Sequence, residues 1–267
     1  MSDRLAGKTA IVFGGGSSGP GVGNGKAAAI AYARAGADVV VVDIAPAAAE
    51  ETAAIIQREG HRALALSADV TSLASVEACV RAALAAYGKI DVLHNNVGVV
   101  FPGGPVELDE AVFQRALDIN LGSVYRTAKV LLPHFVERRS GAIVNISSLA
   151  AIRWTGYPYF AYYAAKAAVA QATTAIALQY APHGVRANSI LPGLIDTPLI
   201  YQQISDQYAS VEDMVAARNK AVPLGRMGTA WDVAAAAVFL ASDEAKFITG
   251  VALPVDGGQS CSVPVPL

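Results

Sequence analysis

A tyrosine and a lysine four residues apart could carry out acid–base chemistry. If the segment is helical, Tyr162 and Lys166 lie one turn apart on the same face. A free phenol has a pKa of about 10, and a neighbouring ammonium that lowered it to roughly 7 or 8 would make it a working general base. The same pair is also typical of a packed ring beside a lysine stem, so the other residues of the candidate site must decide between the two interpretations.

A serine and an asparagine are candidates to complete such a site. Ser148 follows the apolar run 142–146, where its hydroxyl could donate to a substrate oxygen or form a local turn. Asn120 lies where a long helix is expected to end or kink within an apolar stretch, and a buried amide must find partners there. It could bond backbone carbonyls, or it could hold a water that touches Lys166.

A glycine-rich segment indicates a dinucleotide site. Phe13 is followed by Gly-Gly-Gly-Ser-Ser-Gly-Pro-Gly-Val-Gly-Asn-Gly, and a helix is expected to follow. Glycines let backbone amides approach a pyrophosphate, and the start of a helix offers unpaired N–H groups. Asp43 comes 20 residues after Gly23, where a dinucleotide fingerprint has an acidic residue.

Asp43 also bears on which dinucleotide binds. A carboxylate at this position accepts hydrogen bonds from the adenosine ribose and repels a 2′-phosphate. Residues 44–46 supply no arginine or lysine that would neutralise a phosphate. The sequence therefore favours NAD over NADP, and the alternative is that Asp43 caps the next helix.

The same loop contains a rival motif. Residues 15–19 read Gly-Gly-Ser-Ser-Gly, which matches the G-x-S-x-G of a serine hydrolase, with Ser17 as nucleophile and His183 as a nominal base. A nucleophile elbow belongs in the middle of a sheet, whereas Ser17 follows the first predicted strand. Position therefore disfavours the hydrolase hypothesis.

Two kinds of segment alternate along the chain and would position these residues. Short apolar runs are expected as buried strands at 9–13, 39–43, 63–66, 92–93, 142–146, 187–191 and 251–255. Longer alanine-rich stretches are expected as helices at 25–35, 47–59, 72–87, 109–120, 121–139, 157–181 and 230–242. This alternation predicts an α/β fold: a single doubly wound, Rossmann-type domain over 1–267, with a parallel sheet of about seven strands and helices on both faces. Ligands of such a sheet bind at the carboxyl ends of the strands.

Composition excludes several other classes. The 267 residues carry a formal net charge of −2, without the basic run that nucleic acid or an anionic membrane would require. Cys79 and Cys261 are far apart, which favours a reducing, cytoplasmic compartment and argues against a zinc site or any other metal. Hydrophobic residues make up 54% and charged residues only 16%, which suggests subunit interfaces.

The joint order of these features resembles the short-chain dehydrogenase/reductase family across essentially the whole chain. The matching segments are the glycine loop, Asp43, Ala68-Asp69-Val70, Asn95-Asn96-Val97-Gly98, Asn120, Ser148, Tyr162 to Lys166, and Pro192-Gly193-Leu194-Ile195-Asp196-Thr197. The resemblance implies a nicotinamide-dependent oxidoreductase that interconverts a secondary alcohol and a ketone. Tyr162 would be the acid–base group, Lys166 would lower its pKa and hold the nicotinamide ribose, Ser148 would position the carbonyl, and Asn120 would support a proton relay.

The resemblance also implies a set of cofactor contacts. The residues expected to make them are Gly14, Ser18, Asn24, Gly25, Asp43, Asp69, Val70, Asn96, Gly98, Tyr162, Lys166, Pro192, Gly193, Ile195 and Thr197. The glycine loop departs from the family by an insertion of five residues, which leaves two alignments open. If the loop is aligned from the helix that follows it, Gly23 and Gly25 correspond to the last two glycines of the family motif. Aligned from the strand, Gly15, Gly19 and Gly21 fit the spacing. His94 replaces an apolar residue and is expected to be a hydrogen-bonded core histidine.

Substrate and assembly are less tightly specified. The segment 152–160 and a probable lid at 194–222 are expected to frame the pocket. The aromatic residues of the first segment favour a bulky, apolar or cyclic substrate, and they are Trp154, Tyr157, Tyr159 and Phe160. Arg153 could hold a carboxylate, although a surface arginine is the more common outcome.

The predicted helix over 161–181 is small or apolar almost all round, so a second helix could cover its outer side. The segment 121–136 could provide that helix across a two-fold axis, through Val124, Ala128, Leu131, Leu132 and Phe135. The family resemblance implies a homo-oligomer, with a tetramer favoured. A non-catalytic NAD-binding scaffold is the other alternative, but it would have no use for Ser148, Tyr162 and Lys166 together.

Overall fold

A seven-stranded sheet runs through the centre of the computed structural model, which describes residues 3–262 with all their side chains except those of Gln203 and Asp206. Its strands are β1 (Thr9–Phe13), β2 (Asp38–Asp43), β3 (Ala63–Ser67), β4 (Val92–Asn95), β5 (Gly141–Ile146), β6 (Val185–Pro192) and β9 (Ala252–Val255). All pair in parallel in the order β3-β2-β1-β4-β5-β6-β9. Each predicted strand corresponds to one of the seven strands of this sheet, and the predicted Rossmann-type fold is confirmed.

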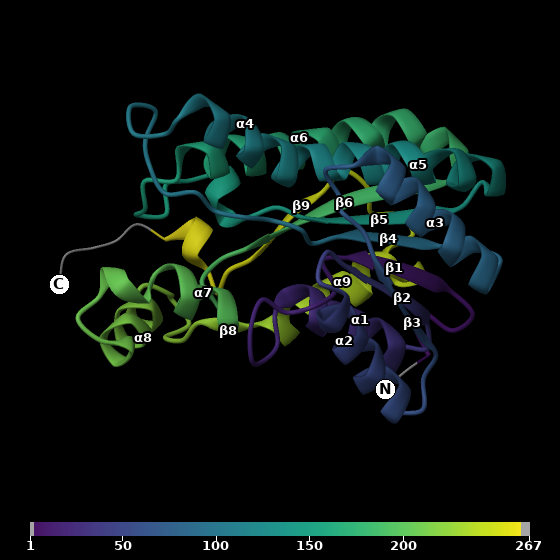
Figure 1. Ribbon diagram of the computed structural model, residues 1–267, viewed down its shortest axis with the longest axis horizontal. Coiled ribbons are helices and arrows are strands. Elements are labelled where there is room, and N and C mark those ends of the chain that lie inside the picture. Colours follow the sequence, from purple (N-terminus) through teal and green to yellow (C-terminus); the bar gives the residue numbers. More distant parts are fainter. Residues whose placement is uncertain (1–2, 263–267) are drawn as a thin grey trace.

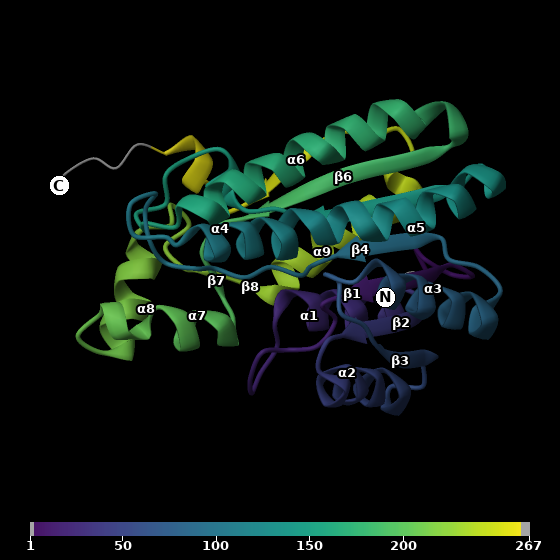
Figure 2. The same cartoon turned by 45° about the horizontal axis from the view of Figure 1, so that its top comes forward.

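Helices cover both faces of the sheet (Figures 1 and 2). One face carries α1 (Asn24–Arg34), α2 (Pro46–Arg58) and α9 (Ala230–Ala241), and the other carries α3 (Leu73–Tyr87), α4 (Glu110–Leu117), α5 (Ser123–Arg138) and α6 (Phe160–Tyr180). Successive side chains of a strand point to opposite faces. Val12 of β1 therefore packs in the core with α1, α2 and α9, while Ile11 packs with α3, α5 and α6.

The strand order reverses between β1 and β4. From β1 the chain continues outward to β2 and β3, and from β4 it continues in the other direction to β5, β6 and β9. Loops on the two sides of this switch diverge at the carboxyl ends of the strands and leave a crevice for a ligand. The glycine loop after β1 and the loop after β4 both begin at this point.

The long helical segment around Asn120 is broken by a wide turn. Helix α4 ends at Leu117, a π-helical turn covers Asp118–Gly122, and α5 begins at Ser123. Sequence reasoning placed an end or kink at this point, and the structure shows which kind it is. Such turns recur at functional sites because they reorient one side chain within a helix.

A smaller lobe extends beyond the sheet at the end of β6. The two-residue strands β7 (Ile195–Asp196) and β8 (Gly228–Thr229) pair with each other, and between them lie α7 (Pro198–Gln203) and α8 (Val211–Lys220). The lobe is anchored by its own apolar cluster, in which Ile204 and Met214 bury against Tyr159. No helix within residues 3–262 is long and apolar enough to cross a membrane.

The apolar side of α5 faces its own sheet. The five side chains expected to meet a second subunit are at most 7% exposed here, and they are Val124, Ala128, Leu131, Leu132 and Phe135. That prediction is wrong for these residues, because the periodicity of an amphipathic helix marks its buried side without saying what buries it. Helix α6 does present small and apolar side chains outward, and Leu178 on that side is 69% exposed.

Candidate active site

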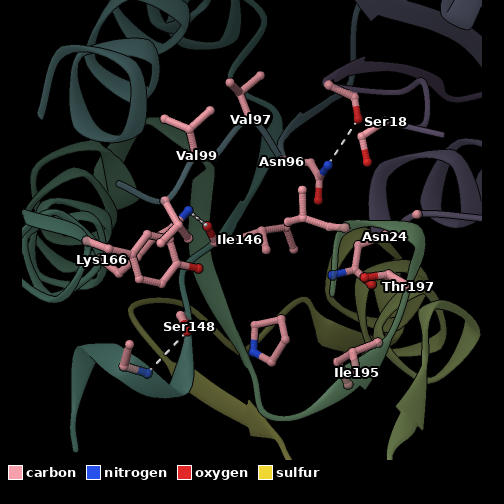
Figure 3. A pocket seen from close by; sticks show the side chains of 18 of the residues that line it. Ser18, Asn24, Asn96, Val97, Val99, Ile146, Ser148, Lys166, Ile195 and Thr197 are labelled. Carbon is pink, nitrogen blue, oxygen red and sulfur yellow. Dashed lines mark hydrogen bonds between the residues drawn. The ribbon is translucent and has the colours of Figure 1, made fainter. Parts of the chain in front are cut away.

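A cavity of about 1500 Å³ opens at the carboxyl ends of the strands. Every residue predicted to contact the cofactor lines it, from Gly14 in the glycine loop to Thr197 before α7. Of the four predicted catalytic residues, Ser148, Tyr162 and Lys166 line it as well. Figure 3 shows Ser148 and Lys166 in this wall. Asn120 does not, because it lies behind the cavity wall and is only 1% exposed.

Tyr162 and Lys166 lie on the same side of α6, one turn apart. The Lys166 Nζ atom is 5.6 Å from the centre of the Tyr162 ring. The same Nζ donates a 2.9 Å hydrogen bond to the backbone oxygen of Ile146 at the end of β5 (Figure 3). The Ser147 hydroxyl in turn donates to the Lys166 carbonyl at 2.7 Å, so the two segments hold each other in register.

Burial governs the ionisation of this pair. Burial raises the pKa of the Tyr162 phenol above its usual value, and hydrogen bonding by Ser148 opposes that rise. Burial lowers the pKa of the Lys166 amine to about 8. Hydrogen bonding by Ser148 lowers the tyrosine pKa here, and the Lys166 amine is directed at the Ile146 carbonyl. That Lys166 lowers the tyrosine pKa stays a prediction.

Ser148 forms the local turn that its sequence position suggested, and its donation to a substrate oxygen stays a prediction. It is the second residue after β5, which ends at Ile146, and its Oγ accepts a 3.1 Å hydrogen bond from Ala150 N at the start of a 3-10 turn. The hydroxyl proton is not used by that bond. Ser148 is thus fixed by the turn while remaining available to Tyr162 and to the cavity.

Asn120 bonds the backbone rather than lining the cavity. Its Nδ2 donates to the carbonyls of Ala116 and Val99, both at 2.9 Å, and its Oδ1 accepts from Val99 N at 3.2 Å. Both amide protons are thereby used. Of the two possibilities open for Asn120, bonding to backbone carbonyls is the one observed, and it ties the loop after β4 to the π-helical turn.

The glycine loop has a tight cradle at the start of α1. A Cβ on Gly25 would lie 1.8 Å from the Gly14 carbonyl oxygen, so only glycine fits there. Gly14 itself has a φ of +76°, a conformation that favours glycine. Close by, Ser17 Oγ and Asn24 Oδ1 are buried without a hydrogen-bond partner among the described residues, although both residues line the cavity. Buried polar atoms normally have partners, so this cradle fits the phosphate and hydroxyl groups of a dinucleotide.

The structure distinguishes the two alignments of the loop. Gly23 and Gly25 flank the first residue of α1 and line the cavity, as the alignment from the helix requires. Gly19 and Gly21 instead face α7: a Cβ on Gly19 would meet the Gln202 side chain at 2.5 Å, and one on Gly21 would meet Pro198 at 3.1 Å. The inserted residues thus leave the cofactor cradle and reach the lobe.

Asp43 is held at the cavity by two backbone amides. Its Oδ2 accepts from Gly16 N at 3.0 Å, and its Oδ1 accepts from Ala45 N at 3.1 Å. It is not the N-cap of α2, because that position belongs to Ala45, which has no capping side chain. The carboxylate is therefore positioned by the glycine loop itself.

The remaining predicted cofactor contacts are fixed by local hydrogen bonds. Asp69 Oδ1 accepts from the Thr71 hydroxyl at 2.7 Å, and that bond is the main reason why the pKa of this carboxyl lies below its usual value. Asn96 Nδ2 donates to the Gly14 carbonyl at 3.0 Å, which links the loops after β1 and β4. At the opposite side, Gly193 N donates to Val255 O at 3.0 Å and leads into Ile195 and Thr197 (Figure 3).

Aromatic side chains frame the other end of the cavity. Trp154, Tyr157 and Tyr159 line it, and Tyr157 and Tyr159 stack with ring centres 5.4 Å apart. Phe160 does not line it, contrary to expectation, because the first turn of α6 directs its ring to Phe113, 6.1 Å away.

Two predictions about single charged or titratable residues are also decided. Arg153 is neither free nor a surface arginine: it is partly buried and donates to the carbonyls of Gln259 and Ser262, so it holds the C-terminal segment against the cavity. His94 is a core residue as expected, fully buried with its Nδ1 2.8 Å from the Tyr32 hydroxyl. Burial lowers the pKa of His94 to about 3.

Sequence reasoning missed Arg218 of α8 and Gln202 of α7. Arg218 is 6% exposed and lines the aromatic end of the cavity. Gln202 Nε2 donates to the Ser18 carbonyl at 2.9 Å across the cavity mouth. Neither residue belongs to a local motif, so only the packing of the lobe reveals them.

The histidine named as general base in the serine hydrolase hypothesis does not lie near Ser17. Within residues 3–262, Ser17 Oγ has no hydrogen-bond partner and the residues lining the cavity include no histidine. His183, the nominal partner, lies beyond the far end of α6 beside Tyr180. A nucleophilic serine requires a base within hydrogen-bond reach, so the G-x-S-x-G match is a consequence of the glycine loop.

Comparison with known proteins agrees with the fold and the motifs. Residues 21–260 match a family model described as enoyl-(acyl carrier protein) reductase. A solved structure described as a short-chain dehydrogenase/reductase from Burkholderia xenovorans superposes with a TM-score of 0.91 at 42% identity, covering 98% of this chain and 99% of the other. The chain belongs to the short-chain dehydrogenase/reductase family.

Several relatives are named as dehydrogenases of cyclic alcohols. A 2,5-dichloro-2,5-cyclohexadiene-1,4-diol dehydrogenase of Sphingobium indicum is 38% identical over 98% of this chain and 100% of its own length. A cis-4-hydroxycyclohexanecarboxylate dehydrogenase of Sinomonas cyclohexanicum is 40% identical over 97% of this chain and 99% of its own length. A 3beta-hydroxysteroid dehydrogenase of Eggerthella lenta is 39% identical over 79% of each chain. These relatives make the chain an oxidoreductase that uses a nicotinamide cofactor.

Proposed function

We propose that this protein is an NAD(H)-dependent oxidoreductase that interconverts a bulky, apolar or cyclic secondary alcohol and the corresponding ketone. The observation that carries the proposal is the meeting of Tyr162, Lys166 and Ser148 on one wall of the cavity whose other wall is the glycine cradle. An acid–base phenol beside a dinucleotide site is what carbinol oxidation requires.

In the proposed mechanism the protein handles the proton. In the oxidative direction Tyr162 accepts the proton of the substrate hydroxyl, and in the reductive direction it returns that proton. Ser148 donates its free hydroxyl proton to the substrate oxygen and keeps that oxygen close to the phenol. The buried Lys166 ammonium supplies positive charge beside the ring, and it would also hold the nicotinamide ribose. A bound nicotinamide supplies the acceptor or donor of the hydride.

Several residues would hold the dinucleotide. Gly14, Gly25 and Ser18 would receive the pyrophosphate at the start of α1, and Asp69 would meet the adenine. Asp43 would accept hydrogen bonds from the adenosine ribose. Its fixed carboxylate and the exposed, uncharged Ile44 beside it support NAD rather than NADP.

The aromatic end of the cavity supports a cyclic substrate. Tyr157 and Tyr159 provide flat apolar surfaces in the same cluster as Tyr162, and Trp154 lines the same cavity. The relatives act, by their names, on cyclohexadiene, cyclohexane and steroid alcohols. We infer that this chain takes an alicyclic alcohol of the same general kind.

The chain is further proposed to act as one NAD-binding unit with residues 194–222 as a lid, and to form a homo-oligomer, with a tetramer favoured. The lobe from α7 to α8 supplies part of the cavity wall, which supports the lid. The small and apolar outer side of α6 supports a subunit contact. Two free thiols, Cys79 and Cys261, support a reducing, cytoplasmic location.

The test is a pair of adjacent tyrosine variants. Tyr162→Phe should lower turnover of alicyclic secondary alcohols by about 10²- to 10⁴-fold while leaving NADH binding nearly unchanged. Tyr163→Phe is the matched control, because its hydroxyl bonds Thr155, 2.7 Å away, and does not line the cavity. Full activity of Tyr162→Phe would refute the assignment. NADH binding by the wild type without turnover of any alcohol or ketone would instead favour the scaffold alternative.

A further inference from the structure

A buried arginine stands in the substrate end of the cavity, and none of the carboxylates that the structure describes pairs with it. Arg218 is 6% exposed and lines the cavity from α8. Among the ion pairs of the described residues none involves Arg218, so no described carboxylate lies within 4.0 Å of its guanidinium. A buried charge is costly unless it is paired, so an arginine in this state is unusual.

The side chains that accept hydrogen bonds from Arg218 are neutral and engage only some of its N–H donors. Its Nη1 donates to the Tyr157 hydroxyl at 3.3 Å, and its Nε donates to Met227 Sδ at 3.2 Å. Sulfur is a weak acceptor, and the guanidinium has five N–H donors in a planar fork. Donors on its cavity side therefore remain for a ligand.

The phenols of Tyr157 and Tyr208 form a polar patch together with the Arg218 guanidinium. The hydroxyls of Tyr157 and Tyr208 are 2.7 Å apart, and both residues line the cavity. Burial raises the pKa of Tyr208 to about 12, and the nearby charge of Arg218 opposes that rise. The Tyr208 phenol consequently stays protonated at neutral pH. Because one of the two hydroxyl protons lies in the bond between the phenols, the pair has one proton left to donate to an anion together with the guanidinium.

The patch belongs to the same end of the cavity as the proposed acid–base residue. Tyr157, Tyr208 and Tyr162 all pack in the apolar cluster built on Ile204 and Met214. A ligand held by Arg218 therefore lies among the aromatic residues that adjoin Tyr162. The glycine cradle, which would hold the phosphates, is formed by different segments.

We propose that Arg218 binds a carboxylate of the substrate, with one hydroxyl of the Tyr157–Tyr208 pair as an additional donor. The substrate is then an alicyclic secondary alcohol that carries an anionic group elsewhere on its ring. Arginine suits this task because its fork can donate two parallel hydrogen bonds to one carboxylate. The inference rests on the proposed function, since it assigns the anion to the molecule that Tyr162 acts upon.

The experiment compares substrates of nearly equal shape. Oxidation of 4-hydroxycyclohexanecarboxylate, its carboxamide and cyclohexanol is followed with NAD in the wild type, Arg218→Met and Arg218→Lys. We expect the wild type to prefer the carboxylate over the carboxamide by about 10- to 100-fold in kcat/KM, mostly through KM. Arg218→Met should abolish this preference while still oxidising the neutral alcohols, and Arg218→Lys should keep part of it.

A binding measurement separates this role from a structural one. Calorimetry of cyclohexanecarboxylate against its carboxamide, on protein saturated with NADH, should show carboxylate-selective binding in the wild type and none in Arg218→Met. If Arg218 only braces Tyr157 and Met227, substitution lowers the melting temperature and weakens both ligands equally, which overturns the inference. If Arg218→Met fails to fold, the wild-type comparison and Arg218→Lys still decide the outcome.

The two hypotheses fail in distinguishable ways. Turnover of neutral alicyclic alcohols with no preference for the carboxylate overturns the role of Arg218 and leaves the proposed function standing. Absence of turnover for every alcohol overturns the proposed function. If the wild type nevertheless bound the carboxylate selectively and Arg218→Met did not, the anion site would still be supported while the proposed function would not.

Discussion

Gly98 leaves the space that the Lys166 ammonium occupies: a Cβ on Gly98 would lie 2.9 Å from Lys166 Nζ and 3.2 Å from Asn120 Oδ1. The loop after β4, α6 and the π-helical turn therefore meet at a position where no side chain fits. Lys166 is 3% exposed and bonded to Ile146, so it has little freedom to move aside.

Gly98→Ala should consequently displace the lysine and lower kcat by up to about 10²-fold, since a misplacement of about 1 Å can have that effect. The folded state should survive, because the added methyl meets the end of a side chain. Steady-state kinetics together with the melting temperature check this. Unchanged kcat in a folded variant would show that the contact is unimportant.

Asp43 should control the choice of cofactor. Asp43→Ala removes the acceptor proposed for the adenosine ribose, so the Kd for NADH should rise about 10- to 100-fold, as expected for hydrogen bonds to a charged group. The Kd for NADPH should stay constant or fall, because the repulsion of its phosphate disappears. Fluorescence titration with both cofactors measures the two effects.

Asp43→Asn is the matched control for loop geometry. It keeps an acceptor for Gly16 N, whose bond to Asp43 is 3.0 Å long, but it removes the negative charge. An asparagine variant that still rejects NADPH as strongly as the wild type would contradict the electrostatic explanation.

Gln202 should slow the release of the cofactor. Its amide joins α7 to the inserted part of the glycine loop through the Ser18 carbonyl, 2.9 Å away. A net hydrogen bond of about 1 kcal/mol corresponds to a roughly fivefold change in rate, so Gln202→Ala should release NADH several-fold faster in stopped-flow fluorescence.

Tyr201→Phe provides the comparison for Gln202→Ala. The Tyr201 hydroxyl bonds Asp196 at 2.8 Å, so its loss perturbs the same helix without touching the glycine loop. Equal dissociation rates for the wild type and both variants would show that the contact does not retain the cofactor.

His94 should make the fold sensitive to acid. Its pKa is about 3 in the folded protein, against an ordinary value of 6.5, so between these values the unfolded chain binds a proton that the folded chain excludes. The contribution is present in full above pH 6.5 and is lost as the pH falls towards 3, with a slope of up to about 1.4 kcal/mol per pH unit.

Chemical denaturation at several pH values tests this contribution. His94→Gln, which keeps an acceptor near Tyr32 without titrating in this range, should unfold with a shallower pH dependence. His61→Gln, a substitution at a partly exposed site, should behave like the wild type. Parallel curves for the wild type and His94→Gln would exclude His94 as the source.

Much of the site could be predicted because its signals are local. A buried parallel strand is a short apolar run, and chemistry in a doubly wound sheet falls at the strand ends, so Ser148, Asp43 and the glycine loop could be placed without coordinates. The spacing of Tyr162 and Lys166 on a helix fixed their common side in the same way.

The predictions that were wrong had used local periodicity to infer which surfaces pack against each other. The apolar side of α5 was expected at a subunit contact and instead covers the sheet, and Phe160 was expected in the cavity and instead meets Phe113. A pattern of apolar residues states that a surface is buried, but the burying partner depends on how distant segments meet.

The sequence by itself determined the order of strands and helices, the positions of the glycine cradle and the acidic residue after β2, and the helical spacing of Tyr162 and Lys166. Only the tertiary structure decided where the Lys166 amine is directed and that Asn120 bonds the loop behind the cavity. It also decided that Arg218 lies among tyrosines with no carboxylate partner in the described part of the chain. The physical reason is range: backbone conformation follows from neighbours along the chain, whereas burial, ionisation and pairing follow from residues that folding brings together.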